Sequence, residues 1–261
     1  MISNSEFLEI LPSLHEACIK AGELQKKYHK TDIDIATKSN KTPVTKIDID
    51  SNIIISDSLK KITPEIPIIS EEDYEGQDKH DSFWIVDPLD GTSNFLHGIP
   101  HWAISIALEH KKEVVIGVIY DPIKNECYVA EKGNGAWLNE KRLRVSGREN
   151  MLEMLFATGI PFANKAGLSS TLQEINHLMP KCSGLRRNGA AALDLAYVAA
   201  GRYDGYFQNN LNLWDIAAGI IIVKEAGGII NEIDLSSLKN IKVLASSAEI
   251  NTKYIEKIGN F

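Results

Sequence analysis

The chain has 261 residues, of which 44% are hydrophobic, 24% charged and 7% aromatic. These values are ordinary for a globular protein, and a chain of this length buries enough apolar surface to fold without disulfides or a structural metal. The 28 basic and 35 acidic side chains give a net charge of −7, which removes the general attraction of a basic protein for nucleic acid or anionic membranes.

The three cysteines, Cys18, Cys127 and Cys182, are far apart and form no C-x-x-C pair. This pattern predicts reduced thiols and a cytoplasmic protein rather than a disulfide framework or a zinc ribbon. No apolar run approaches the roughly 18 residues of a membrane span, and the first 20 residues lack the basic start and apolar core of a signal peptide. We therefore expect no membrane partner.

The first half of the chain begins with helical patterns and continues with strands. Apolar residues at three-to-four spacing predict a helix from Phe7 to Tyr28 and another over residues 49–59, separated by a polar stretch with a turn at Thr42-Pro43. Short apolar runs then predict strands, with a tight turn at Gly133-Asn134-Gly135 before the last of them. The predicted strands cover residues 66–70, 83–86, 103–108, 114–120, 126–130 and 136–138.

The second half alternates helices with strands. We expect helices over 190–200, 216–226 and 248–258, and short strands over 206–207 and 243–245. A run of strands followed by alternation predicts a layered α/β (α+β) architecture. No linker-like segment divides the chain, so we expect one domain, 1–261, with approximate subdomains 1–145 (α+β) and 146–261 (α/β).

The segment 84–92, W-I-V-D-P-L-D-G-T, places two aspartates directly after an apolar run. Pro88 stiffens the turn between Asp87 and Asp90, and Gly91 lets the backbone approach a ligand closely. Carboxylates that converge beyond a strand are costly unless a cation neutralises them, and oxygen ligands select hard ions such as Mg²⁺. An isolated pair of this kind is more often a pair of turn aspartates that cap a helix, but that interpretation must also explain the other acidic segments.

Three further acidic segments follow or precede apolar elements. Glu71-Glu72-Asp73 follows the run 66–69, Asp215 opens the predicted helix 216–226, and Asp48 lies in V-T-K-I-D. Taken singly, the triplet is typical of a solvated loop and Asp215 of a helix N-cap. Each segment is ambiguous by itself, whereas the joint order and spacing of the four segments is distinctive.

These segments, in this order, resemble the inositol monophosphatase family of magnesium-dependent, lithium-sensitive phosphatases. The resemblance spans about residues 38–248 and implies a layered αβαβα sandwich, a homodimer and two or three Mg²⁺ ions per site. The matching pieces are Val44-Thr45-x-x-Asp48, Glu71-Glu72, the segment 84–92, Asn94-Phe95, His97-Gly98-Ile99-Pro100, Arg187-Asn188-Gly189-Ala190-Ala191, Trp214-Asp215 and Ala226-Gly227-Gly228.

The resemblance implies the metal ligands position by position. Glu71, Asp87 and the carbonyl of Leu89 correspond to ligands of a first Mg²⁺. Asp87, Asp90 and Asp215 correspond to ligands of a second. Two bridged cations of this kind stabilise both the attacking water and the leaving oxygen of a phosphate ester.

The implied catalytic residues are Asp48, Thr92 and Glu71. Thr92 corresponds to a residue that orients the attacking water, and Asp48 to the proton acceptor, linked through Thr45 or Thr92. Gly91 and Thr92 are expected to begin a helix whose free N–H groups, together with Asp90, bind the phosphate.

The residues that the resemblance implies as contacts to the alcohol match the family less completely than the metal ligands do. Gly189, Ala190 and Ala191 match a loop that contacts the hydroxyls, whereas Gln208, seven residues before Asp215, replaces the glutamate of many members. Glutamine still hydrogen-bonds a hydroxyl but brings no charge. A surface residue at a strand end explains Gln208 equally well.

We therefore expect a phosphate monoester hydrolase that acts on inositol 1-phosphate or a similar polyol monophosphate by metal-activated water attack. One alternative is a 3′(2′),5′-bisphosphate nucleotidase, which residues 38–45 resemble, although the K-E-F of that branch is absent after Gly91-Thr92. Another is a transcription-associated regulatory protein like the bacterial extragenic suppressors, for which contact with nucleic acid or RNA polymerase stays open. Because every expected carboxylate is present, we expect catalysis in either case.

Overall fold

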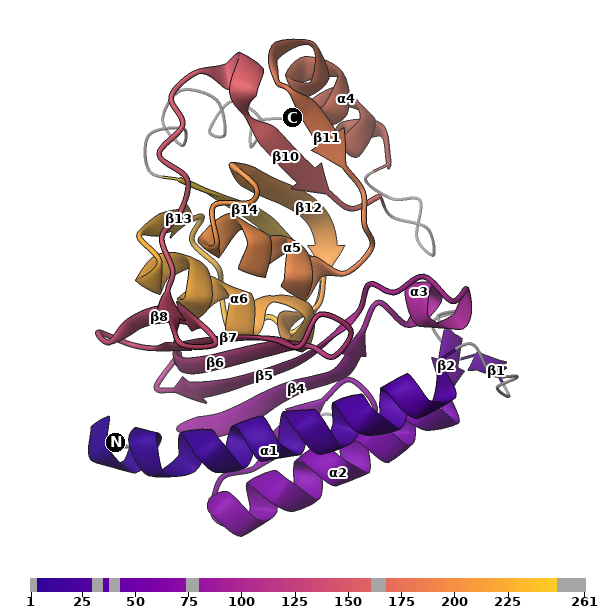
Figure 1. Cartoon of the computed structure of the whole chain (residues 1–261), viewed down its shortest axis with the longest axis vertical. Coiled ribbons are helices and arrows are strands. Elements are labelled where there is room, and N and C mark those ends of the chain that lie inside the picture. The colour runs from indigo at the N-terminus through magenta and orange to yellow at the C-terminus, as the bar shows by residue number, and fades with distance from the viewer. Residues whose placement is uncertain (1–3, 30–34, 38–42, 74–79, 161–167, 248–261) are drawn as a thin grey trace.

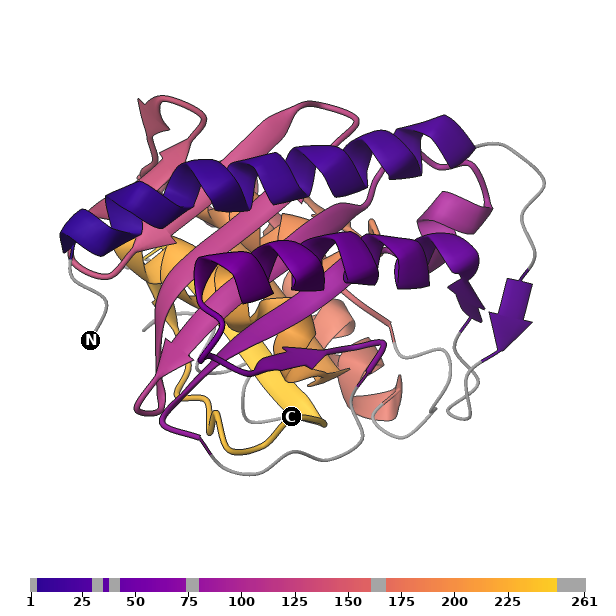
Figure 2. The same cartoon turned by 90° about the horizontal axis from the view of Figure 1, so that it is seen from below.

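The computed structural model describes residues 4–29, 35–37, 43–73, 80–160 and 168–247. Five layers follow one another: two helices, a seven-stranded sheet, two helices, a five-stranded sheet and one outer helix (Figure 1). The outermost pair, α1 (Asn4–Tyr28) and α2 (Lys46–Ile62), lies side by side across one face of the larger sheet (Figure 2). The predicted αβαβα sandwich is thus confirmed.

The larger sheet is antiparallel except at one edge, where β3 runs parallel to β4. Its strands, in spatial order, are β3 (Ile68–Ser70), β4 (Ser82–Asp90), β5 (Ala103–His110), β6 (Glu113–Asp121), β7 (Glu126–Glu131), β8 (Gly135–Leu138) and β9 (Lys141–Arg142). Both faces are covered, so alternate residues of β4 enter different cores. Trp84 and Val86 pack with α1 and α2, whereas Ile85 packs in the core that contains α5 and α6.

The smaller sheet is mixed and carries α4 (Leu168–Leu178) on its outer side, where Leu178 packs with Phe156 and Phe207. Its strands, in spatial order, are β11 (Gly184–Arg186), β10 (Leu155–Thr158), β12 (Gly205–Leu211), β14 (Ile241–Ser247) and β13 (Gly228–Ile230).

The helices α5 (Ala191–Ala199) and α6 (Leu213–Glu225) fill the space between the two sheets. Most of their residues are apolar and buried, as expected of helices that lie between two sheets. They also pack closely: a Cβ added at Gly219 of α6 would lie 2.4 Å from Cδ1 of Leu195, and one added at Gly117 of β6 would lie 2.7 Å from the carbonyl oxygen of Ala218.

Most predicted elements are confirmed; the missed ones are mainly short strands and single turns, together with the helix α4. The polar stretch 30–46 contains the antiparallel pair β1 (Ile35–Thr37) and β2 (Pro43–Thr45), so Pro43 begins a strand, while Thr42 lies outside the described residues. Also missed were β9, β10, α4, β11, β13 and the single turns Met151–Glu153 and Met179–Lys181. Strands of two to four residues are too short for alternation to be visible in the sequence. The predicted helix 248–258 lies outside the described residues.

Two expectations from composition bear on the described part of the chain. Cys18, Cys127 and Cys182 are free thiols, and the first two are buried. Among the described residues, no helix combines the length and apolar character needed to cross a membrane.

Candidate active site

The two aspartates of β4 lie on either side of a break in the strand. Asp87 pairs with Ser105 and Asp90 with Ala103, so three steps along β4 match two along β5. Such a bulge turns side chains away from the regular alternation. The Leu89 N–H donates a 3.0 Å hydrogen bond to Oδ1 of Asp87 and fixes the turn between the two aspartates.

Three predicted metal ligands from distant segments converge beside this bulge. Glu71 follows β3, Asp87 lies in β4 and Asp215 lies in the first turn of α6, and one carboxylate oxygen of each is within 4.8 Å of the others. Asp215 is not the N-cap of its helix: that position belongs to Asn212, whose N–H donates a 2.8 Å hydrogen bond to Oδ2 of Asp215. The capping interpretation of Asp215 therefore misplaced the cap by three residues.

The fourth predicted carboxylate ligand, Asp90, is not part of this group of three and is held by the beginning of α5. The Ala192 N–H donates a 2.8 Å hydrogen bond to Oδ2 of Asp90, and the Ala191 N–H interacts with the same carboxylate. The first N–H groups of a helix have no partner within the helix, so they favour a carboxylate at this position. This contact brings the predicted substrate loop to the end of β4.

The electrostatics of these carboxylates suit a hard cation. Burial, followed by the charges of Glu71, Asp90 and Asp215, raises the pKa of Asp87 well above its usual range. Burial raises the pKa of Asp90 to about 7; hydrogen bonds from Ala192 and Ala191 oppose the shift, and the charge of Glu71 adds to it. Such crowded oxygen donors repel one another unless a cation lies between them, and an all-oxygen donor set fits Mg²⁺.

Thr92 and Asp48, two of the predicted catalytic residues, are in contact. The Thr92 hydroxyl shares its hydrogen between Oδ1 of Asp48, 3.0 Å away, and the carbonyl oxygen of Leu89, 3.1 Å away. Asp48 is buried in the first turn of α2. The predicted helix start is also present: Gly91, with φ +100°, caps the short helix α3 (Thr92–Leu96). Of the two proposed links to Asp48, only Thr92 can be placed, since the side chain of Thr45 is not among those described.

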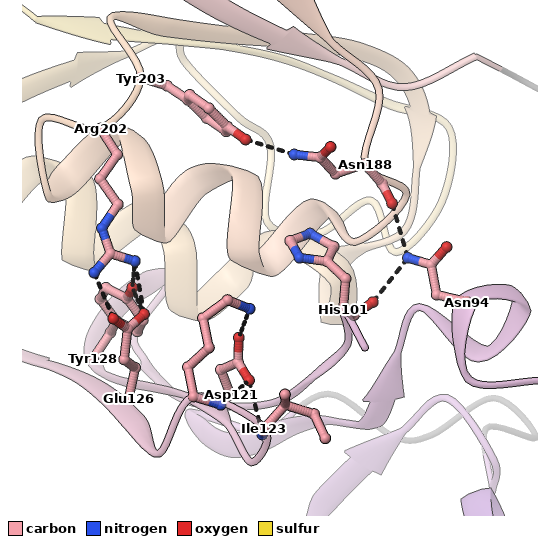
Figure 3. Close-up of polar contacts among 10 residues, drawn as sticks. Asn94, His101, Asp121, Ile123, Glu126, Tyr128, Asn188, Arg202 and Tyr203 are labelled. Carbon is pink, nitrogen blue, oxygen red and sulfur yellow. Dashed lines mark hydrogen bonds and ion pairs between the residues drawn. The ribbon is translucent and has the colours of Figure 1, made fainter. Parts of the chain in front are cut away.

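The predicted substrate loop is joined to α3 through Asn94, a contact that sequence reasoning missed. Its Nδ2 donates 2.8 Å hydrogen bonds to the carbonyl oxygens of both Asn188 and His101 (Figure 3). The side chain of Asn188 in turn bonds the hydroxyl of Tyr203 at 2.5 Å. These bonds fix the backbone just before Gly189. Asn94 belongs to the segment that resembles the family, but nothing in the sequence indicates its partners.

Gln208 lies on β12 and is half-buried, so it is not simply a surface residue. Its Oε1 accepts a 2.6 Å hydrogen bond from the Tyr206 hydroxyl. Burial, and then the charges of Asp194, Asp90 and Asp215, raise the pKa of Tyr206, so its phenol is neutral and donates. Asp194 of α5 is a second feature that sequence reasoning missed: it is 1% exposed, and burial raises its pKa well above the usual range.

The layered fold holds a cluster of carboxylates that could bind a metal ion, and comparison with known proteins identifies the class of protein. The model of the inositol monophosphatase family matches residues 6–260. The inositol-1-monophosphatase of Caulobacter vibrioides is 43% identical over 87% of this chain and 91% of its own length. The Nus factor SuhB of Escherichia coli is 42% identical over 83% of this chain and 82% of its own length.

Solved structures agree with the sequence comparisons. The extragenic suppressor protein SuhB of Bartonella henselae is 40% identical and superposes with a TM-score of 0.87, covering 96% of this chain and 98% of its own. The chain belongs to the inositol monophosphatase family. It is accordingly a phosphoric monoester hydrolase.

Proposed function

We propose that this chain is a Mg²⁺-dependent phosphatase of polyol monophosphates, with inositol 1-phosphate as the first candidate substrate. The observation that carries the proposal is the approach of Glu71, Asp87 and Asp215 to within 4.8 Å in a member of this family. A relative named inositol-1-monophosphatase that is 43% identical supports the choice of substrate.

We assign Glu71, Asp87, Asp90, Asp215 and the carbonyl of Leu89 as the groups that hold two or three Mg²⁺ ions. Bound there, Mg²⁺ would supply Lewis-acid stabilisation of the charge that develops on the phosphoryl and leaving oxygens. The mutual repulsion of these carboxylates around the buried Asp87 supports this assignment.

The protein's own contribution to the reaction is orientation and proton transfer. Because the Thr92 hydroxyl donates to Asp48, its oxygen is available to accept a hydrogen bond from the attacking water, and Asp48 is placed to receive the proton through that hydroxyl. Gly91, Thr92 and Asp90 lie at the phosphate end of the proposed site. Gly189, Ala190, Ala191 and Gln208 lie at the alcohol end, which Asn94 links to α3.

A phosphate-release screen tests the proposal. The purified protein would be assayed with inositol 1-phosphate, 3′-phosphoadenosine 5′-phosphate, fructose 1,6-bisphosphate and histidinol phosphate, each with Mg²⁺ and with EDTA. We expect Mg²⁺-dependent release that is fastest with inositol 1-phosphate and inhibited by Li⁺. Preference for the adenosine bisphosphate would instead establish the nucleotidase alternative, and release that is unaffected by EDTA would contradict the metal site.

A role in transcription is a second candidate, and the names of the relatives favour it. Several proteins that are 41–42% identical are called Nus factor SuhB. Binding of the chain to RNA polymerase, measured by co-sedimentation with the wild type and with Asp215→Asn, separates this role from catalysis: a regulatory contact survives the loss of the carboxylate. We also propose a cytoplasmic homodimer, for which light scattering at several protein concentrations is the test.

A further inference from the structure

The helix α2 presents two buried polar side chains, one turn apart, toward the proposed site. Asp48 is 1% exposed and Asn52 is 2% exposed. Residues four apart lie on the same face of a helix. Asp48 holds the hydroxyl of Thr92, as described above, whereas Asn52 reaches the turn that follows β3.

Asn52 uses both ends of its amide on residues that flank Glu71. Its Oδ1 accepts a 2.7 Å hydrogen bond from the hydroxyl of Ser70, which is 1% exposed, and its Nδ2 donates to Oδ2 of Asp73. The Ser70 hydroxyl also accepts from the N–H of Glu72 at 3.4 Å. One side chain on a helix therefore ties down the residue before the proposed metal ligand and the second residue after it.

Glu71 needs such support because the sheet stops just before it. β3 is a three-residue edge strand, and its pairing with β4 ends at Ser70 opposite Val86. The Glu71 N–H adds a 3.1 Å bond to the carbonyl oxygen of Val86, after which the chain turns away. A ligand in a turn binds a metal tightly only if neighbouring hydrogen bonds fix its backbone beforehand.

We propose that Asn52 is a positioning residue that holds Glu71 ready for Mg²⁺, acting through Ser70 and Asp73. The inference deepens the proposed function and rests on it. The bond to Asn52 also gives the Asp73 carboxylate a partner on α2, which restrains the turn two residues after Glu71.

The test is Mg²⁺ affinity measured by titration calorimetry on the full chain, with phosphate release as a second readout. Asn52→Ala removes both bonds, and with them a 3.5 Å bond that Oδ1 accepts from Ser56 on the same helix. It should weaken Mg²⁺ binding about tenfold, the lower end of the effect of losing a supporting contact to a metal ligand. The Mg²⁺ concentration for half-maximal activity should rise equally, while turnover at saturating Mg²⁺ changes little. Ser51→Ala is the matched control: Ser51 is fully buried on the same helix but bonds Gln25 of α1, so Mg²⁺ affinity should change less than about twofold.

A charge-preserving exchange separates positioning from general destabilisation. Asn52→Asp alone places a carboxylate against Asp73 and should weaken Mg²⁺ binding at least as much as Asn52→Ala. Combining it with Asp73→Asn restores a donor opposite an acceptor and should bring the affinity back to within about threefold of the wild type. An affinity that stays low in the double variant would overturn the assignment.

The variant Glu71→Gln separates the positioning role of Asn52 from the proposed metal site itself. If Glu71→Gln weakens Mg²⁺ binding but Asn52→Ala does not, the positioning role is wrong and the metal site stands. If Glu71→Gln itself binds Mg²⁺ like the wild type, the proposed metal site is wrong, and the inference falls with it.

Discussion

The side-chain amide of Asn94 donates a 2.8 Å hydrogen bond to the backbone carbonyl of Asn188, 94 residues further along the chain. The same nitrogen donates to the carbonyl of His101 at the same distance. The short helix that begins at Thr92 and the loop that leads to Gly189 are thereby joined through one buried side chain (Figure 3). The phosphate and alcohol ends of the proposed site are set at a fixed separation.

Removing this link should affect substrate binding as well as stability. Asn94→Ala leaves two carbonyl groups without this donor, which costs about 1–3 kcal/mol of unfolding free energy, and should raise the KM for inositol 1-phosphate about tenfold. Asn231→Ala is the control, because Asn231 makes a comparable set of bonds to Lys242 and Leu244 on β14. Both variants should lose stability in chemical denaturation. An unchanged KM in Asn94→Ala would reduce its role to structural support.

Replacing a proposed carboxylate ligand should abolish activity and preserve the fold. Asp90→Asn and Asp215→Asn should each lower Mg²⁺-dependent phosphate release by about 100-fold or more, because the remaining ligands cannot hold the cation that stabilises the transition state. Circular dichroism should match the wild type. Asp57→Asn, on the exposed face of α2, should retain full activity. Normal turnover in either site variant would contradict the assigned ligands.

Metal removal should make stability depend on pH through the carboxylate cluster. The pKa of Asp90 is raised to about 7 and that of Asp87 is raised as well, so the folded protein keeps protons that the unfolded chain has released above about pH 4. The metal-free protein should therefore become less stable as the pH rises from about 4 through about 7. Melting curves in EDTA and in Mg²⁺ should show a larger Mg²⁺-induced rise in Tm at pH 8 than at pH 5. An equal Mg²⁺-induced rise in Tm at the two pH values would argue against metal binding by these groups.

His101 should cause a loss of stability in acid. Burial, followed by the charge of Lys124, lowers the pKa of His101 to about 4. The folded protein keeps this ring neutral while the unfolded chain takes up a proton below about pH 6.5, so stability should fall by up to about 3 kcal/mol between pH 6.5 and 4. In denaturation with Mg²⁺ present, His101→Gln should flatten this slope. His80→Gln, at an exposed histidine, should leave it unchanged.

Gln208 offers a test of substrate preference. In Gln208→Glu the hydroxyl of Tyr206 still has an oxygen to which it donates, but the amide donor beside it becomes a charged acceptor. The ratio of kcat/KM for inositol 1-phosphate to that for 3′-phosphoadenosine 5′-phosphate should rise about tenfold, since a carboxylate accepts from hydroxyls and repels a second phosphate. A constant ratio would place Gln208 outside the substrate contacts.

Local chemistry determined which features could be predicted from the sequence. Asp87 and Asp90 were found because an apolar run, a proline and a glycine surround them within a few residues. Asp215 was taken for a possible cap because the helix was predicted to begin at residue 216, whereas it begins at Leu213 and Asn212 is its cap. The role of Asn52 could not be foreseen, since its partners depend on how α2 crosses the turn after β3. The contact between Asn94 and Asn188 likewise exists only once two distant loops have packed.

The close contacts of α6 have a bearing on how substrate range can diverge in such a scaffold. Gly219 lies against Leu195, and the backbone of Ala218 lies against Gly117. Because both contacts are close, the helix that carries Asp215 cannot shift relative to its neighbours without steric overlap. Any drift in the spacing of the layers would displace a reacting group. Novel specificities are therefore expected to arise by altering the surrounding loops, while the buried helical pair is inherited intact.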